Sequence, residues 1–192
     1  MVKALKQFLS RFAVLDEKDY LLLASLGECR SFNKKIRLVD VGDIDSHLNL
    51  VIKGLVRKYI IRGEEEIITQ IAREGELVSS SVSFLTESPS GYIIETIEPT
   101  ILFSFTFEQI EELYRKDAKW ERLGRLIITD LYLQNEQRDL DQIRYTTRER
   151  FLKFVEENPE FLIRVPQKFL ASYLQIQPET FSRLKHLLHH HQ

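Results

Sequence analysis

Hydrophobic and polar positions divide the chain into a helical start, a strand-rich middle and a helical end. Over residues 2–25 apolar side chains recur at helical spacing, with an interruption at Asp16. From about Cys29 to Phe107, short apolar runs alternate with turn signals and predict strands at 48–52, 55–61, 67–71, 92–97 and 100–105. Many short strands at regular spacing favour a β-sandwich or barrel over a parallel α/β sheet.

A long helix is predicted next, from about Asp117 to Gln142, without an internal proline. Its first half is apolar almost all round, so it must be covered on more than one side. A second copy of the same helix is the simplest cover, and burial within a single subunit is the alternative. The residues expected at this dimer interface are Trp120, Leu123, Gly124, Ile127, Leu131 and Gln134, with Gly124 allowing two backbones to approach.

The last part of the chain carries the most specific pattern. Thr146 and Glu149 form a T-x-x-E capping box, which predicts a new helix and a hinge over residues 144–147. From Val165 the sequence VPQKFLASYLQIQPETFSRLKHLL has the spacing of a helix-turn-helix, with the small Ala171 where two helices cross. Pro166 and Pro178 suit first helical positions. An ordinary pair of amphipathic helices is the alternative, since periodicity alone does not separate the two.

The second helix of this unit presents side chains suited to a major groove. A carboxylate accepts from cytosine N4 and an arginine donates twice to guanine O6 and N7. We expect Glu179, Ser182 and Arg183 to read bases. The residues expected to contact the DNA backbone are Lys168, Gln177, Thr180 and Lys185.

Composition narrows the class of protein. The chain has 192 residues, 43% of them hydrophobic, and a net charge of −2, which is ordinary for one globular core plus a small appendage. No apolar run approaches a bilayer span and no signal peptide is visible, so we expect no membrane partner. The single cysteine, Cys29, excludes an internal disulfide and favours a cytoplasmic location.

The residues also argue against an enzyme. A cupin-type metal site needs two histidines and a carboxylate from the strands, and only His47 lies in the strand-rich region. No histidine is paired with a nucleophile in the body of the chain. The C-terminal histidines His186, His189, His190 and His191 have spacing that could bind nickel or zinc, but we interpret them as a frayed, solvated end. We therefore expect no catalytic residue and no metal site.

The order of these parts resembles the Crp/Fnr family of bacterial transcription regulators. The resemblance covers nearly the whole chain, and its most specific stretch is P-E-T-F-S-R, residues 178–183, which looks like the family's recognition-helix signature. It implies an α+β fold with a cyclic-nucleotide-binding-like β-roll at residues 1–116, a long dimerisation helix at 117–143 and a helix-turn-helix domain at 144–192. It further implies a homodimer that binds double-stranded DNA and RNA polymerase.

The chain departs from the family where cyclic nucleotides bind. Aligned on Gly75, Phe84 and Pro89, Ser80 stands where those members have the ribose-binding glutamate and Ser90 where they have the phosphate-binding arginine. No Lys or Arg lies between Arg73 and Arg115 to replace that arginine, so we expect cyclic AMP not to be the effector. The candidate pocket residues are Glu76, Ser79, Ser80, Ser81, Ser90, Gln134 and Asn135. The serines could line a pocket for another ligand, but we interpret them as turn and cap residues of a roll that has lost its ligand.

Two further departures affect the helix-turn-helix. Gln175 stands where the turn usually has glycine, and a positive φ there would cost of order 1 kcal/mol. The chain stops soon after the second helix, so the β-hairpin wing that often follows in this family is expected to be missing.

Other sensor types can be checked against the same residues. An iron–sulfur sensor needs several cysteines and a haem sensor needs a supported Cys/His pair; neither is present. The alternative function is a cyclic-nucleotide or other small-ligand sensor whose C-terminal helices bind protein rather than DNA.

Overall fold

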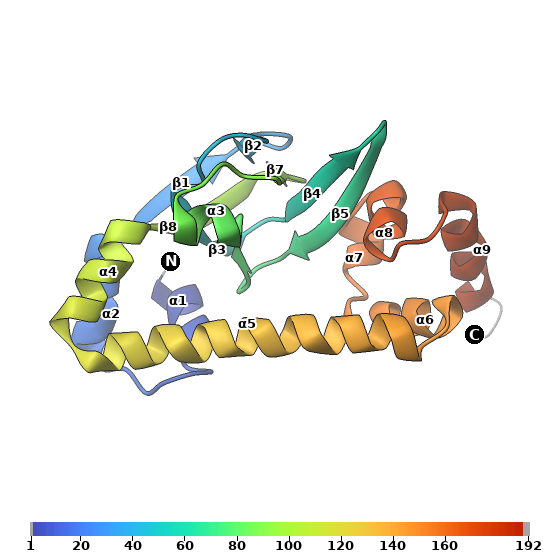
Figure 1. The fold of residues 1–192 in the computed structure, drawn as a ribbon. Helices are drawn as coiled ribbons and strands as arrows, with labels where there is room; N and C mark the ends of the chain where they lie inside the picture. The colour runs from blue at the N-terminus through green and yellow to red at the C-terminus, as the bar shows by residue number, and fades with distance from the viewer. Residues whose placement is uncertain (1, 190–192) are drawn as a thin grey trace. The chain divides into compact units, whose positions relative to one another are not determined.

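The computed structural model describes residues 2–189, in two compact units. The first unit comprises residues 1–60 and 69–128, and the second comprises Ile61–Ile68 with Thr129–Gln192. The two C-terminal histidines His190 and His191 lie outside the described residues, as does the side chain of His189. Figure 1 labels the elements.

The first unit begins with two helices, α1 (Val2–Leu9) and α2 (Glu17–Leu26). Asp16, where the apolar pattern is interrupted, is the N-cap of α2. Its side chain accepts from the Asp19 N–H while the Asp19 side chain accepts from the Asp16 N–H, which completes a capping box. Lys119 donates to the largely buried Asp19 at 2.5 Å and so ties α2 to a later helix.

Eight strands follow as two four-stranded antiparallel sheets, in the orders β1-β8-β3-β6 and β2-β7-β4-β5. The strands are β1 (Glu28–Phe32), β2 (Arg37–Val39), β3 (His47–Lys53), β4 (Val56–Arg62), β5 (Glu65–Ala72), β6 (Leu77–Val78), β7 (Ile93–Thr96) and β8 (Thr100–Thr106). All five predicted strands are present. The sequence pattern does not predict β1, β2 and β6 individually, because they are short or mix polar with apolar residues.

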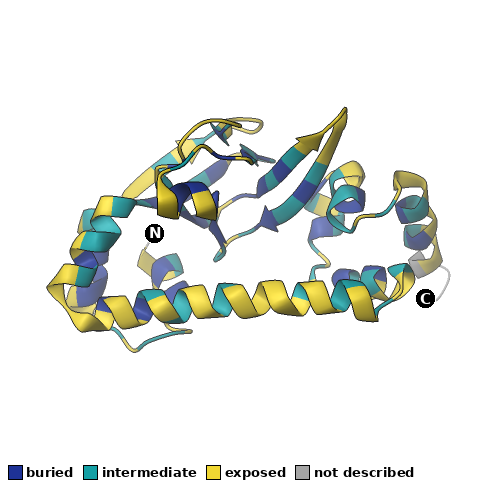
Figure 2. Cartoon of the chain, in the orientation of Figure 1, coloured by how far each residue is buried: buried dark blue, intermediate teal, exposed yellow. Residues whose placement is uncertain are grey.

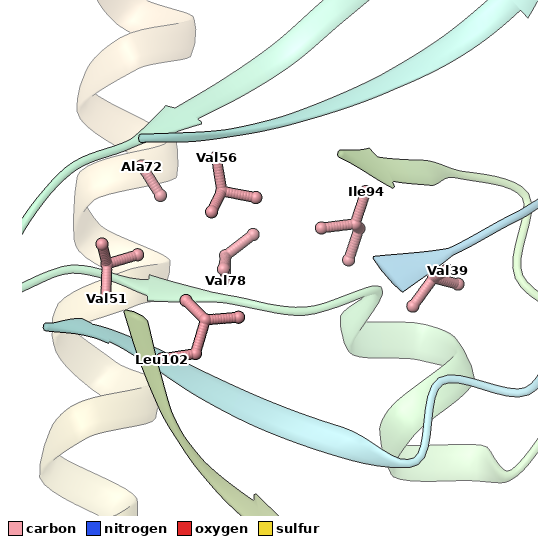
Figure 3. Close-up of a cluster of buried hydrophobic side chains, with 7 residues drawn as sticks. All are labelled: Val39, Val51, Val56, Ala72, Val78, Ile94 and Leu102. Atoms are coloured by element: carbon pink, nitrogen blue, oxygen red, sulfur yellow. The ribbon is translucent and has the colours of Figure 1, made fainter. Parts of the chain in front are cut away.

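The core of the roll lies between the two sheets. Its centre is a cluster of aliphatic side chains from several strands, shown in Figure 3: Val39, Val51, Val56, Ala72, Val78, Ile94 and Leu102. Because side chains alternate along a strand, the residues on either side of each of these point away from the cluster. On β4, Lys58 therefore shares the inward face with Val56.

Two helices of the first unit were not predicted. The short α3 (Ser81–Thr86) lies in the serine-rich stretch, and α4 (Phe107–Lys116) follows β8 directly. A second capping box, between Thr106 and Gln109, starts α4. This T-x-x-Q pattern is a sequence signal for a helix start.

The long helix α5 runs from Ala118 to Arg144, and its predicted dimer-facing side is covered by the chain itself. Trp120 and Leu123 are only 3% and 5% exposed. A Cβ at Gly124 would lie 2.0 Å from the Tyr114 hydroxyl, so the small residue accommodates α4 rather than a partner's backbone. In the single chain these three residues pack inside their own subunit, and their contact with a second copy stays a prediction.

In its C-terminal half, the opposite side of α5 carries exposed apolar side chains beside the charged Glu136. A helix turns roughly 100° per residue, so Leu133, Leu140 and Ile143 lie on the side away from Trp120. Their exposures are 59%, 48% and 86%, and Figure 2 shows much of this helix as exposed. Of the other residues predicted at the interface, Ile127 and Leu131 are half-buried, whereas Gln134 is exposed and donates to Asp130 of the same helix.

The second unit contains the C-terminal half of α5 and four more helices, which are α6 (Thr147–Glu157), α7 (Phe161–Arg164), α8 (Gln167–Tyr173) and α9 (Pro178–His189). The predicted capping box is confirmed: Thr146 is the N-cap of α6, and the Thr146–Glu149 exchange is complete. The predicted hinge is braced by two cations of α6. Lys153 forms an ion pair with Asp141, and Arg150 donates to the carbonyls of Gln142 and Tyr145.

The architecture is the α+β arrangement that the sequence predicted, with a β-roll, a long helix and C-terminal helices. Within residues 2–189, no helix is long and apolar enough to cross a membrane. The same part of the chain contains no group of three or more His, Cys, Asp or Glu side chains that could hold a metal ion.

Candidate nucleic-acid interface

Two helices and a tight turn form the candidate interface in the second unit. Ala171 is 1% exposed near the end of α8, as expected for the point where two helices cross. Leu170 and Phe181 are fully buried behind it, and the Phe181 ring meets Phe151 of α6 edge-on at 5.3 Å. Pro178 is the first residue of α9, as predicted, but Pro166 precedes the first turn of α8 and serves as its N-cap.

The turn has the positive φ at Gln175 that is costly for a residue other than glycine. Gln175 has a φ of 56°, in the left-handed region where glycine is favoured. The strain is offset by backbone hydrogen bonds on both sides: the Gln175 N–H donates to the Ser172 carbonyl and the Ile176 N–H to the Ala171 carbonyl, each at 3.0 Å. The turn is therefore held in place although it lacks glycine.

The predicted base-reading residues lie together on the outer side of α9. Glu179, Ser182 and Arg183 are spaced three and four residues apart and share one helical face, whereas Phe181 and Leu184 point into the domain. Glu179 and Arg183 are exposed, and Ser182 is half-buried. Glu179 also lies in the first turn of the helix, where the helix dipole favours a carboxylate.

The predicted backbone-contacting residues surround this face. Lys168 at the start of α8 and Gln177 in the turn are exposed, and Thr180 and Lys185 are half-buried. The Lys168 ammonium group lies 5.0 Å from the Phe169 ring. These residues offer two cations and two polar side chains next to a carboxylate, a hydroxyl and a guanidinium, a set that can contact phosphates and base edges together.

The second candidate site, at the serine-rich stretch of the roll, is closed by its own side chains. Ser80 and Ser90 are almost fully buried, and their hydroxyl groups are hydrogen bonded to each other at 2.8 Å. The Ser90 hydroxyl also accepts the Tyr92 N–H at 3.0 Å. The two serines that the sequence alignment predicted at the ribose and phosphate positions are therefore adjacent, and their hydroxyl groups are bonded to each other.

A buried carboxylate completes this hydrogen-bonded network. Asp45 accepts the Ser80 N–H at 2.6 Å and the His47 N–H at 3.2 Å, while its own N–H donates to the Ser83 hydroxyl. Burial raises the pKa of Asp45, although its hydrogen bonds act in the opposite direction. The carboxylate thus joins the β2–β3 loop to the start of α3.

One basic residue near this network lies far from it in the sequence, so its presence here was not predicted. The Lys58 ammonium group donates to the Ser79 carbonyl at 3.3 Å and lies 5.1 Å from the Tyr92 ring. The stretch between Arg73 and Arg115 lacks a cation, but Lys58 reaches the site from β4. Strand alternation could have indicated it, because Lys58 follows the core residue Val56 by two positions.

Of the other predicted pocket residues, Ser79 lies beside the network and the rest lie apart from it. Ser79 is buried and contributes its carbonyl, but Ser81 is exposed. The Glu76 carboxylate accepts from the Arg73 backbone N–H at 3.1 Å and from the Arg73 guanidinium at 3.3 Å. Gln134 and Asn135 are exposed residues of α5 in the second unit.

A β-roll of two antiparallel sheets followed by a long helix and a helix-turn-helix is the fold of the bacterial catabolite activator type. Solved structures share it over most of both chains, and three of them illustrate the similarity. The catabolite activator protein of Thermus thermophilus is 21% identical, with 96% of this chain and 87% of that chain covered and a TM-score of 0.59. FixK2 from Bradyrhizobium japonicum is 19% identical, with 86% and 85% covered and a TM-score of 0.73.

The third is the c-di-GMP-responsive global regulator CLP of Xanthomonas campestris. It is 16% identical, with 91% of this chain and 92% of that chain covered and a TM-score of 0.70. No protein-family model matches the sequence, and no curated protein matches it. The solved structures therefore show that the resemblance seen in the sequence holds at the level of the fold.

Proposed function

We propose that this protein is a DNA-binding transcription regulator of the Crp/Fnr type, that it is not an enzyme, and that it binds a near-palindromic site as a homodimer. One observation carries the proposal: α9 exposes Glu179 and Arg183 on one face while Phe181 and Leu184 fix its other face in the domain core. Side chains of this kind on the second helix of such a unit can enter a major groove. RNA polymerase is the further partner that the resemblance implies.

The exposed side of α5 supports the homodimer. Leu133, Leu140 and Ile143 are separated by seven and three residues, which is the spacing of core positions in a coiled coil. The opposite side of this half of the helix is already in use, since Arg138 lies 4.9 Å from the Tyr173 ring and Asp141 is paired with Lys153. We therefore place the dimer contact on the side of Leu133 rather than on the side of Ile127.

The closed serine network supports an effector other than cyclic AMP, or none. A cyclic phosphate needs a charge-assisted donor in its half-buried site, and Ser90 offers a hydroxyl that is engaged with Ser80 and Tyr92. Lys58, the cation that contacts this stretch, is bonded to the Ser79 carbonyl. A ligand would have to break several of these bonds to enter.

Selection of bound DNA from a random pool by the intact protein tests the proposed function. We expect an enriched sequence with two-fold symmetry and half-sites about one helical turn, roughly 34 Å, apart. A pool selected in parallel with Arg183→Ala should lose its preference at one symmetric pair of positions. Recovery of no enriched sequence by the parent protein would favour a sensor whose helices bind protein.

A further inference from the structure

The free edge of β5 in the roll is occupied by a side chain of the helix-turn-helix. β5 is the last strand of its sheet, so the backbone groups on one of its sides have no neighbouring strand. The Ser172 hydroxyl of α8 fills two of these positions at once. It donates to the Glu66 carbonyl at 2.7 Å and accepts the Ile68 N–H at 2.9 Å.

This contact lies within the second unit. Ile68 is only 1% exposed, and the tip of the β4–β5 hairpin, Ile61–Ile68, belongs to the same compact unit as α8. The two groups that Ser172 joins are separated from it by more than 100 residues of sequence. One hydroxyl group therefore forms hydrogen bonds with a backbone N–H and a backbone carbonyl at the strand edge, as a further strand would.

Ser172 also holds the turn that leads to α9. Its carbonyl accepts the N–H of Gln175, the residue with a positive φ. The adjacent Tyr173 ring lies 5.8 Å from the Phe154 ring and 4.9 Å from the Arg138 guanidinium of α5. The end of α8 is thus fixed from the hairpin through Ser172 and from α5 through Tyr173, immediately before the turn that sets the direction of α9.

We propose that the β4–β5 hairpin tip is a buttress of the helix-turn-helix and that Ser172 is a positioning residue that fixes the orientation of α9. This inference rests on the proposed DNA-binding function. The tip itself carries Glu64, Glu65 and Glu66, whose charges would repel phosphates. Its contribution to DNA binding is therefore to orient the reading helix and not to contact DNA.

The contact is tested first without DNA, by hydrogen exchange of the Ile68 amide in the full chain. Ser172→Ala removes both hydrogen bonds of the hydroxyl, so this amide should exchange about tenfold faster or more. Ser172→Thr keeps a hydroxyl and should restore most of the protection. Ser25→Ala is the matched control, because the Ser25 hydroxyl donates to Leu22 of its own helix. Unchanged exchange in Ser172→Ala would overturn the buttress.

The positioning role is tested on the selected DNA with half-sites moved apart or together by one base pair. A parent dimer with fixed helices should discriminate strongly among the spacings, and Ser172→Ala should reduce that discrimination about tenfold. Its base preference at the positions affected by Arg183 should stay unchanged. Loss of stability alone would lower binding to all spacings equally, and that result would contradict the proposal.

Failure of this inference can be distinguished from failure of the proposed function. If the parent protein selects no DNA, the proposed function and the positioning role are both wrong, whatever the hydrogen-exchange rate of the Ile68 amide. If the parent selects DNA but Ser172→Ala keeps the full spacing preference, only the positioning role falls. Should Ser172→Ala not fold, Ser172→Cys, whose thiol is only a weak donor and acceptor, is read in the same two assays with the same criteria.

Discussion

The hydroxyl groups of Ser80 and Ser90 are hydrogen bonded to each other at 2.8 Å in the interior of the first unit. Ser80 stands at the start of α3 and Ser90 in the loop before β7, so the bond closes the polar stretch between them. At these two positions the roll has two neutral hydroxyl groups that are hydrogen bonded to each other. It does not have a charged pair that could hold a nucleotide. This relationship gives the two serines a structural role that does not require a ligand.

Replacement of Ser90 should therefore destabilise the protein even though no ligand is involved. Ser90→Ala leaves the buried Ser80 hydroxyl and the Tyr92 N–H without this partner, and we expect a loss of about 1–3 kcal/mol in the free energy of unfolding. Urea denaturation measures it. Ser81→Ala is the control, since Ser81 is exposed on the same stretch and should change stability by less than about 0.5 kcal/mol. Equal effects of the two variants would contradict the closed network.

Cyclic AMP and cyclic GMP should not bind with micromolar affinity. The site lacks an arginine for the phosphate, and the serine hydroxyls are already paired. Isothermal titration calorimetry should give no saturable heat, and a hundredfold excess over a micromolar dissociation constant should leave the melting temperature unchanged. A ligand bound that tightly would stabilise the fold by about 2.7 kcal/mol at this excess, so a clear upward shift would refute the assignment.

The buried Asp45 predicts a pH dependence of stability. Burial raises the pKa of this carboxyl in the folded state above its unfolded value of about 3.9. The folded state therefore takes up the proton first as pH falls, and the contribution of Asp45 to stability is greatest below the unfolded pKa and is lost as pH rises through the folded pKa. Denaturation of the parent and of Asp45→Asn between about pH 7 and pH 4 should show the parent gaining stability relative to the variant. A difference that is flat or of opposite sign would contradict this.

The proposed homodimer predicts different effects for substitutions on the two sides of α5. Leu133→Glu with Leu140→Glu places charges on the exposed apolar side and should yield a folded monomer in light scattering. Each leucine buried between two copies contributes about 1.5–3 kcal/mol, and neither is needed by a single chain, since both are exposed in it. Asn135→Glu, exposed on the other side of the helix, is the control and should leave the dimer intact. A double variant that stays dimeric would move the interface elsewhere.

The proposed role of α9 as a recognition helix predicts that sequence preference and salt dependence can be changed separately. Arg183→Ala should cost about 1–3 kcal/mol of base discrimination per half-site and flatten the preference at one symmetric pair of positions. Lys185→Ala should weaken all sequences alike and reduce the salt slope by about 1 for each phosphate that the lysine neutralises. Binding assays on selected and scrambled DNA over a range of salt measure both. Full preference retained by Arg183→Ala would exclude it as a base-reading residue.

Local features of the chain were predictable because they depend on neighbouring residues. The capping box of Thr146 and Glu149 set the start of α6, strand alternation located β3, β4, β5, β7 and β8, and the small Ala171 marked the crossing of α8 and α9. The same kind of local signal, at Thr106, marks the start of α4. The pattern of size and charge over residues 165–188 was enough to predict the helix-turn-helix and the outer face of α9.

Tertiary structure alone decided which surfaces these elements use. The first half of α5 was expected to be apolar on nearly all sides, but the exposed Glu121, Arg122 and Arg125 mark a solvent side. The packing of Trp120 and of Tyr114 against Gly124 decided which side its own subunit covers. Lys58 and Ser172 act on partners from distant parts of the sequence. A hydroxyl or an ammonium group fits many surroundings, and only the folded backbone fixes which donor and acceptor come within about 3 Å of one another.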